Sequence, residues 1–268
     1  MGRPQEHDAD TAAALVDAAE RLVHTDGLEA LTVRRVATEV GTTTRAVYTL
    51  FGSKEGLVVA LGQRAFEILS DGLRRLPETD DPAGDLIEAG VRVFRRFALD
   101  HPALFRIAFQ RPPSPEIVAG FRPAGNQALL ILKARVERLK ATGQLGARPV
   151  WPSVSEFDAL CEGLAAVELR GQMLPGPPPS LSARPDPQPG DRAGDPERVD
   201  GNERMWRGAL TALVRGFAIS DTAYRENPES EPNRVTEAPP AREPARPRRR
   251  ADVGAVNEMT LRPRLPDG

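Results

Sequence analysis

The stretch from Leu31 to Leu57 constrains the fold of this chain more strongly than any other part of the sequence. Thr32 is suited to cap a short helix whose apolar positions have the three-to-four spacing of a buried stripe: Val33, Val36, Ala37 and Val40. Gly41 ends that helix, because glycine tolerates the left-handed conformation that follows a helix C-terminus. Thr43 can then cap a second helix over residues 44–51. The pattern predicts a helix-turn-helix.

The outward surface expected on the second helix is rich in hydrogen-bond donors and contains no acid. Its apolar residues can face the first helix, which leaves Thr44, Arg45, Tyr48 and Thr49 on the remaining surface. Ser53 can cap a third helix, with Lys54 in its first turn. A cation there opposes the helix dipole unless an external anion is present. A DNA phosphate would supply that anion.

The same stretch resembles the DNA-binding segment of the TetR family of bacterial transcription regulators. The resemblance rests on residues of fixed type at fixed spacing: L-T-V-x-x-V-A, a glycine, a short polar turn, Y-x-x-F and S-K-E-x-L. Two positions depart from the family pattern. Gly56 stands where Glu commonly closes a capping box with Ser53, which predicts a looser helix start, and Leu50 stands where an aromatic residue or His is common.

The resemblance and the side-chain donors together assign contacts with DNA. Thr32, Tyr48 and Lys54 are expected at phosphates, whereas Arg45, at the amino-terminal end of the recognition helix, is expected to read a guanine. The full set expected to bind DNA is Thr32, Arg34, Thr42, Thr43, Thr44, Arg45, Tyr48, Thr49 and Lys54. The alternative is a helical hairpin whose basic residues are merely solvated.

Composition limits the other classes of function. With 36 basic and 38 acidic residues the chain is close to neutral, so DNA affinity has to come from local arrangement; residues 32–54 hold four basic residues and one acid, Glu39. One cysteine excludes an internal disulfide, and His7, His24 and His101 with Cys161 form no ligand cluster, so we expect no metal and no cofactor. No apolar run suggests a membrane span, and a cytoplasmic setting is expected.

All periodic segments of the chain predict helices, so the expected fold is all-α. Residues 1–10 are expected to form an N-terminal arm, and residues 11–56 a three-helix DNA-binding head that begins with a helix over residues 11–26. Residues 57–224 are expected to form a larger helical ligand-binding and dimerisation domain. Its expected helices cover residues 54–75, 82–100, a short segment after His101, a stretch from beyond Pro123 to about Gly143, 154–174 and 203–224.

Two segments lack the apolar residues that a core needs. Residues 175–202 contain eight prolines and are expected to be a disordered insert, and residues 225–268 a disordered tail. The tail includes the arginine-rich run of residues 242–250. That run suits either a nonspecific DNA contact or a solvated charged tail.

Aromatic residues on several helices of the larger domain predict an apolar pocket for a small molecule, although simple core packing is the alternative for each of them. The expected lining residues are Phe94, Phe97, Phe105, Phe109 and Leu132. The runs H-P-A-L-F-R-I-A-F and C-E-G-L-A-A-V-E-L resemble the regulatory domain of a TetR subgroup that carries Trp, His and Gly in this helix; Gly163 matches, but Glu162 takes the His position. The family's four-helix dimer implies an interface of Leu160, Gly163, Leu164, Val167, Leu210, Val214 and Phe217.

The sequence offers no nucleophile with its base, metal set or phosphate-binding glycine loop, so we do not expect an enzyme. The prediction is a dimeric transcriptional regulator that binds a near-palindromic double-stranded operator and responds to an unidentified small apolar effector. Its sign of control, repression, follows from the resemblance alone. The alternative is an all-helical protein-interaction module, which would not require salt-dependent binding to duplex DNA.

Overall fold

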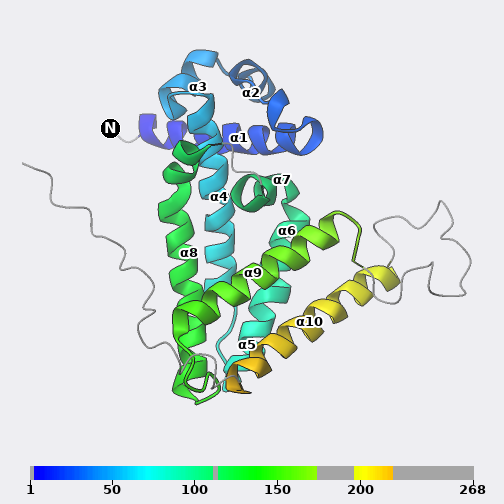
Figure 1. Ribbon diagram of the computed structural model, residues 1–268. Coiled ribbons are helices and arrows are strands. Elements are labelled where there is room, and N and C mark those ends of the chain that lie inside the picture. Colours follow the sequence, from blue (N-terminus) through cyan, green and yellow to red (C-terminus); the bar gives the residue numbers. More distant parts are fainter. Residues whose placement is uncertain (1–2, 111–113, 174–195, 220–268) are drawn as a thin grey trace, which may run out of the picture. The chain divides into compact units, whose positions relative to one another are not determined.

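The computed structural model describes residues 3–110, 114–173 and 196–219, and every regular element in these ranges is a helix, as the sequence predicted (Figure 1). The first four helices are α1 Arg3–Asp26, α2 Val33–Val40, α3 Thr44–Phe51 and α4 Lys54–Arg75, with a 3₁₀ turn, η1 Leu28–Ala30, before α2. There follow α5 Pro82–Glu88, η2 Ala89–Arg95, α6 Arg96–Asp100, α7 Pro102–Phe105, η3 Arg106–Gln110, α8 Pro115–Ala141, α9 Val150–Leu169 and α10 Pro196–Ile219. Residues 175–195 of the expected insert and the whole expected tail lie outside the described residues.

Three predicted N-caps begin the helices of the helix-turn-helix and α4. In each cap a side-chain oxygen accepts a hydrogen bond from the backbone N–H three residues later: Thr32 from Arg35 at 3.3 Å, Thr43 from Ala46 at 3.2 Å and Ser53 from Gly56 at 3.1 Å. Gly41 ends α2 with a φ of 74°, in the left-handed region that glycine adopts without strain. Local sequence therefore fixes the ends of α2 and the start of α3.

The start of α4 is tighter than the sequence predicted. A Cβ atom at Gly56 would overlap the backbone carbonyl oxygen of Phe51, so the turn between α3 and α4 closes over a position without a side chain. The Ser53 cap forms even though no Glu completes a capping box. The prediction of a looser helix start is corrected, because glycine permits a backbone approach that Glu would prevent.

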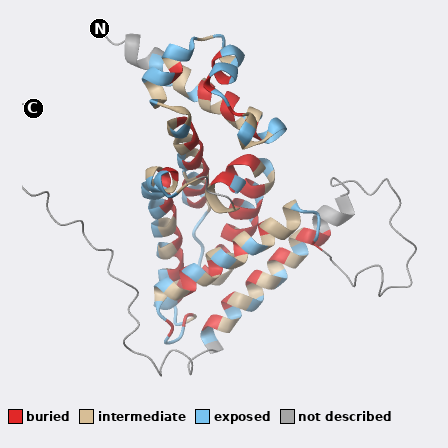
Figure 2. Cartoon of the chain, turned by 45° about the horizontal axis from the view of Figure 1, so that its top comes forward, coloured by how far each residue is buried: buried red, intermediate tan, exposed pale blue. Residues whose placement is uncertain are grey.

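The head has a continuous apolar core that α4 extends toward α8. Figure 2 shows buried residues on the inward faces of these helices. The buried set in the head is Leu15, Ala18, Ala19, Val23, Leu31, Val33, Val36, Ala37, Val47, Leu57, Val58 and Leu61. Val40, expected in the buried stripe of α2, is partly buried, as is Leu22 of α1. All described residues fall within one unit of contacts, residues 1–230.

Several helices begin earlier than expected. α1 begins at Arg3, so the described part of the expected arm is helical; Pro4 suits a first turn, and acidic residues near a helix N-terminus favour the dipole. α8 begins at Pro115 and continues through Pro123, capped by Ser114, whose hydroxyl accepts from the Ile117 N–H at 3.4 Å. α9 covers Val150–Leu169 rather than 154–174, and α10 begins at Pro196 rather than 203. A proline at a helix start lacks only an N–H that would have no helical partner there.

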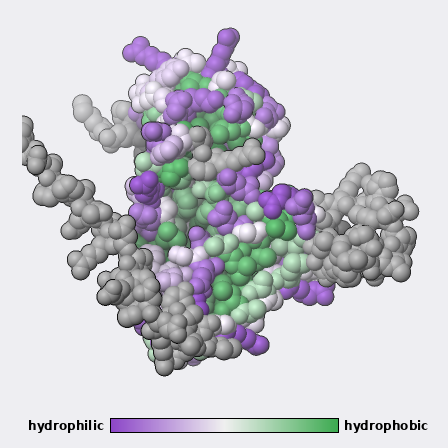
Figure 3. Space-filling model, in the orientation of Figure 1, coloured by the Kyte–Doolittle hydropathy of each residue, from purple (hydrophilic) through white to green (hydrophobic). Residues whose placement is uncertain are grey.

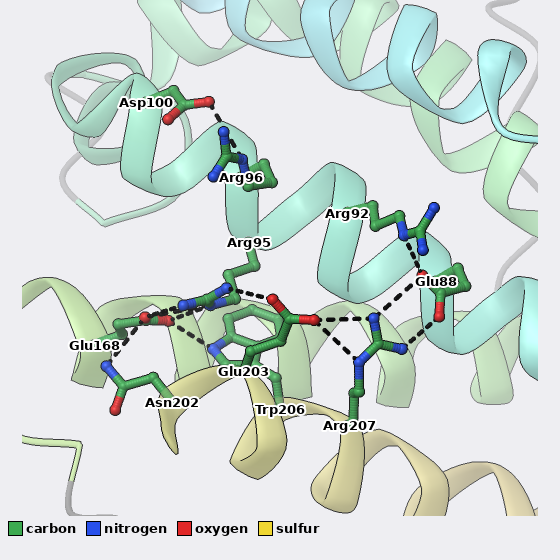
Figure 4. A network of polar contacts seen from close by, with 10 residues as sticks. All are labelled: Glu88, Arg92, Arg95, Arg96, Asp100, Glu168, Asn202, Glu203, Trp206 and Arg207. Carbon is green, nitrogen blue, oxygen red and sulfur yellow. Dashed lines mark hydrogen bonds and ion pairs between the residues drawn. The ribbon is translucent and has the colours of Figure 1, made fainter. Parts of the chain in front are cut away.

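A buried polar network attaches α9 and α10 to η2, the π-helical turn between α5 and α6 (Figure 4). The guanidinium of Arg95 lies 2.8 Å from a carboxylate oxygen of Glu168, and both side chains are almost fully buried. Glu168 also accepts hydrogen bonds from Trp206 Nε1 at 2.8 Å and Asn202 Nδ2 at 3.1 Å. Because a buried charge is costly without partners, these contacts fix three helices in one arrangement.

Candidate functional site

The structure brings the predicted DNA-binding residues to one surface, formed by α2, α3 and the start of α4. Seven of the nine are exposed: Thr32, Arg34, Thr43, Thr44, Arg45, Tyr48 and Thr49. Thr42 and Lys54 are partly buried. Tyr48 is 53% exposed, which is unusual for a large aromatic residue that serves only the core.

Ion pairs with α1 cancel two of the charges in this segment. Arg35 pairs with Asp26 at 2.5 Å and donates to the carbonyl oxygen of Ala30 at 3.2 Å. Glu39, the one acid expected in the patch, pairs with Arg21 at 2.9 Å. Arg35 is therefore a structural residue, although its charge was counted toward the patch.

Three cations remain on this surface. Among the described residues, Arg34, Arg45 and Lys54 form no ion pair. We name these three residues the basic patch. A group of unpaired cations beside a helix N-terminus is the arrangement that a polyanion requires.

Thr49 differs from its prediction in one respect. Its hydroxyl donates to the backbone carbonyl of Arg45 at 2.9 Å, as Thr38 does to Arg34 at the same distance. This bond, four residues back along the helix, uses the hydroxyl proton. Thr49 can therefore face DNA as an acceptor, whereas a phosphate contact needs a donor.

The N-terminus of α4 carries a field that favours anions. The pKa of Glu55 is held below its usual range, first by hydrogen bonding at the helix N-terminus and then by the Ser53 hydroxyl. Lys54 lies in the same turn, so its cation and the backbone N–H groups act in the same direction. This turn is suited to a phosphate group.

A cavity of about 250 Å³ lies between α4, η2, η3, α8 and α9. Phe94, Phe109 and Leu132 line it, as predicted. Phe97 and Phe105 do not; they pack against Phe109 at ring-centroid distances of 6.4 and 5.3 Å, behind the wall. Sequence reasoning missed three further lining phenylalanines, Phe66 of α4, Phe121 of α8 and Phe157 of α9. Periodicity identifies an inward face but not which part of that face borders a space.

The cavity wall also holds three polar residues that the sequence did not single out: Arg122 and Asn126 of α8 and Asp158 of α9. Arg122 and Asn126 are exposed, whereas Asp158 is partly buried. Burial, with a further contribution from Glu162, raises the pKa of Asp158 to about 6. The position of Asp158 beside the buried Phe157 was the available sequence signal.

The predicted dimer residues divide between the two sides of α9 and α10. Leu160, Leu164 and Val167 are partly exposed and Gly163 is exposed, so a partner could reach them. Leu210, Val214 and Phe217 are only 0, 5 and 1% exposed within the single chain. Their assignment to a partner is corrected: they pack inside the protomer, where α10 contacts α5, η2 and α9. The sequence periodicity of α10 indicated an apolar face, but it did not indicate whether a partner or the same chain covers that face.

The outward side of the two helices is apolar and includes two exposed glycines. Figure 3 shows apolar side chains gathered over α9 and α10. Both Gly163 and Gly208 are exposed, and a Cβ atom at either would meet open space. Because these two positions carry no side chain, the backbone of another helix could approach this side closely.

Charged contacts join the head to the regulatory part. Arg64 of α4 pairs with Asp17 of α1 and lies 3.5 Å from Glu20. His101, between α6 and α7, also contacts Glu20. A polar cleft of about 440 Å³ lies beside these groups. We name Asp17, Glu20, Arg64 and His101 the junction.

No group of three or more metal-ligating side chains occurs in the described ranges. None of the helices in the same ranges combines the length and apolarity needed to cross a membrane.

Comparison with solved structures places this fold among known regulators. Similar folds include PfmR from Thermus thermophilus (19% identity, 75% of this chain and 97% of that chain, TM-score 0.53) and GusR from Salmonella enterica (16%, 80% and 98%, TM-score 0.57). FadR from Bacillus subtilis, solved in complex with stearoyl-CoA, is also similar (14%, 76% and 98%, TM-score 0.58). At these identities the likeness shows the fold.

Sequence comparison identifies the family. Residues 15–61 match the family model of bacterial regulatory proteins of the tetR family, and residues 87–186 match that of the tetracyclin repressor-like C-terminal domain. No curated protein matches the chain. The two family models together cover more than half of the 268 residues and correspond to the helix-turn-helix surface and to the helices around the cavity. The chain therefore belongs to the TetR family of bacterial transcription regulators.

Proposed function

We propose that the protein is a homodimeric repressor that acts in the cytoplasm, binds a near-palindromic operator and leaves it when a small apolar effector occupies the cavity. The observation that carries this proposal is the position of α4. Its first turn contributes Lys54 to the basic patch, and farther along it contributes Phe66, Leu69 and Leu73 to the cavity. One helix thus connects both sites.

The contacts with DNA fall into two groups. Lys54, Tyr48 and Thr32 are assigned to phosphates, which position α3 in the major groove without reading sequence. Thr43, Thr44 and Arg45 lie at the amino-terminal end of α3, the end that meets base edges, and Arg45 can form a bidentate pair with guanine. The exposure of all these residues except Lys54, which is partly buried, supports the assignment.

Two heads are needed to read a palindrome. The outward sides of α9 and α10, which carry Gly163 and Gly208, are the surface proposed to pair with a second copy. In such a dimer the two α3 helices would enter successive major grooves, with half-site centres about 34 to 36 Å apart.

Release by an effector requires only that the effector bind one arrangement of the dimer more tightly than another. The cavity supports this step, since its walls come from α4 and from the two π-helical turns η2 and η3. Turns of this kind often occur at functional sites. The stearoyl-CoA bound to FadR from Bacillus subtilis shows that a solved protein of similar fold takes up a ligand with a long apolar chain.

The decisive experiment selects genomic DNA fragments on the purified protein and then titrates the selected operator at several salt concentrations. Regulator function predicts tight binding to one near-palindromic class of fragment, with affinity that falls steeply as salt rises. A protein-interaction module would bind no class of fragment in preference to another. A metabolite screen for loss of operator binding then tests the switch.

A further inference from the structure

The wall of the cavity contains an acid without a cationic partner. Asp158 lines the cavity, and among the described residues it forms no hydrogen bond and no ion pair. A second acid, Glu162, lies one turn later on α9. The pKa of Asp158 is raised by burial and by Glu162, with no cation lowering it. Asp158 is therefore an acid of the cavity wall that has no ion-pair partner among the described residues, while Arg122, a cation of the same wall, is exposed.

The rest of the wall suits a cation better than an anion. Five aromatic rings line the cavity: Phe66, Phe94, Phe109, Phe121 and Phe157. The faces of aromatic rings attract cations, and recognition of quaternary ammonium groups by such rings is well established. A carboxylate or phosphate in this space would instead meet Asp158 as a like charge, and Arg122, the cation of the wall that could offset it, is exposed.

Most other charged groups on the surrounding helices are held by partners or do not line the cavity. Arg135 of α8 is buried outside the lining and donates to the carbonyl oxygens of Leu73 and Leu76. Arg122 of α8 lines the cavity but is exposed. Arg95 of η2 is held by Glu168, Arg96 of α6 by Asp100, and Arg207 of α10 by Glu88 and Glu203. Cys161, the remaining titratable neighbour on α9, is buried with its pKa raised well above the usual range, so the thiol stays neutral.

We propose that the effector of this cavity is an apolar organic cation, an aryl or alkyl ammonium compound whose charge pairs with Asp158 while its apolar body lies against the phenylalanine rings. This inference rests on the proposed function and specifies its effector class. The volume of about 250 Å³ lies just below the usual range for small-molecule sites, which indicates a compact molecule such as one with a single ring.

The test compares three ligands of similar size, two of which have nearly equal shape, by calorimetry on the full-length protein. Benzyltrimethylammonium is the cation, neopentylbenzene replaces its nitrogen by carbon, and 4-phenylbutanoate carries a negative charge. We expect the cation to bind at least about tenfold more tightly than either of the others. Asp158→Asn should lower the affinity for the cation about tenfold and leave the affinity for neopentylbenzene unchanged. The matched control is Glu162→Gln, which keeps Asp158 in the cavity wall. It should lower the affinity for the cation less than Asp158→Asn does.

A second measurement needs no variant. The charge of benzyltrimethylammonium does not titrate, so any pH dependence of its binding comes from the protein. With the pKa of Asp158 at about 6 and a neutral side chain that binds about tenfold more weakly, the affinity should fall about fivefold between pH 7.5 and pH 5, as the carboxylate is protonated. Binding of neopentylbenzene should not change over the same range.

Three results would overturn the proposal: binding of 4-phenylbutanoate as tight as that of the cation, no binding of the cation at about 1 mM, or an Asp158→Asn variant that binds the cation normally. These results leave the proposed function standing if another small molecule releases the operator. The proposed function fails separately, if the protein selects no operator.

Discussion

The Nδ1 atom of His101 lies 2.6 Å from Oε1 of Glu20, which joins the end of α6 to α1 of the head. Glu20 also lies near Arg64, and Arg64 pairs with Asp17. The rings of His101 and Phe97 stack at 6.1 Å, and Phe97 packs against Phe109 in the cavity wall. A contiguous set of contacts therefore runs from the cavity to the helix that supports the helix-turn-helix.

Breaking the junction should loosen α1 without unfolding the protein. Arg64→Met removes the charge that holds Asp17 and Glu20, and because these groups are partly exposed the cost should be about 1 kcal/mol or less. Hydrogen exchange of the α1 amides should become faster, while exchange in α9 stays unchanged. Arg75→Met is the matched control, since Arg75 lies on the same helix, is 82% exposed and pairs only weakly with Asp71. Equal exchange in the two variants would show that the junction does not hold the head.

Two residues of the basic patch should respond differently to truncation. Lys54→Ala should weaken binding to all DNA sequences and reduce the salt slope, because it removes a phosphate contact. Arg45→Ala should cost about 1 to 3 kcal/mol and relax preference at one base pair in each half-site. Titration of both variants against the operator and its single-base variants, at several salt concentrations, separates the two effects. If Arg45→Ala loses the same affinity for every variant, Arg45 contacts a phosphate instead.

The sequence predicted the head well because its determinants are local. Thr32, Gly41, Thr43 and Ser53 cap or end helices through bonds that span a few residues, and such bonds can be read from spacing alone. The role of Arg35 could not be read in this way. Its partner, Asp26, belongs to another helix, so only the tertiary arrangement shows that its charge is used within the fold.

The same reason explains the errors in the regulatory part. Phe105 and Phe109 are equally apolar, yet only Phe109 reaches the cavity. Leu210 lies on a helix expected to pair with a partner, but its face is covered by the chain itself. The cavity position of Asp158 could not be predicted from its neighbours in sequence, because its environment is made by residues of α8 and η2 that are distant in sequence. The pattern of apolar and polar residues predicts that a helix face is buried, but it does not predict which residues cover that face.

A larger residue at Gly163 should separate the dimer while leaving the protomer folded. Glutamine at this position meets open space in the protomer and has a higher helix propensity than glycine, by about 0.5 to 1 kcal/mol. The same side chain would hold a partner helix away, so the dimer dissociation constant should rise by about tenfold or more. Sedimentation across a dilution series measures the dissociation constant. Gly163→Ala is the control, since a methyl group gains helix propensity and still permits close approach; an unchanged dimer in Gly163→Gln would place the interface elsewhere.

Removing the charge of Asp158 should stabilise the protein without ligand at neutral pH. The pKa of this carboxyl rises from an ordinary value of 3.8 to about 6 on folding, so between these values the native state holds more protons than the unfolded state. Stability therefore decreases as pH rises from about 4 to about 6, and the full penalty applies above that window. Asp158→Asn should raise the free energy of unfolding at pH 7.5 by about 1 to 2 kcal/mol, after allowance for partial exposure.

The same substitution should make little difference to stability at about pH 3, where the carboxyl is mostly protonated in both states. Urea unfolding at about pH 7.5 and about pH 3, at one fixed protein concentration because the protein is proposed to be a dimer, measures both values. Glu162→Gln provides the comparison, since the pKa of Glu162 is also raised by burial but its side chain does not line the cavity. A residue kept for structure alone would lose stability on substitution. A gain in stability at pH 7.5 together with weaker binding of the cation is the combination expected of an acid retained for a ligand.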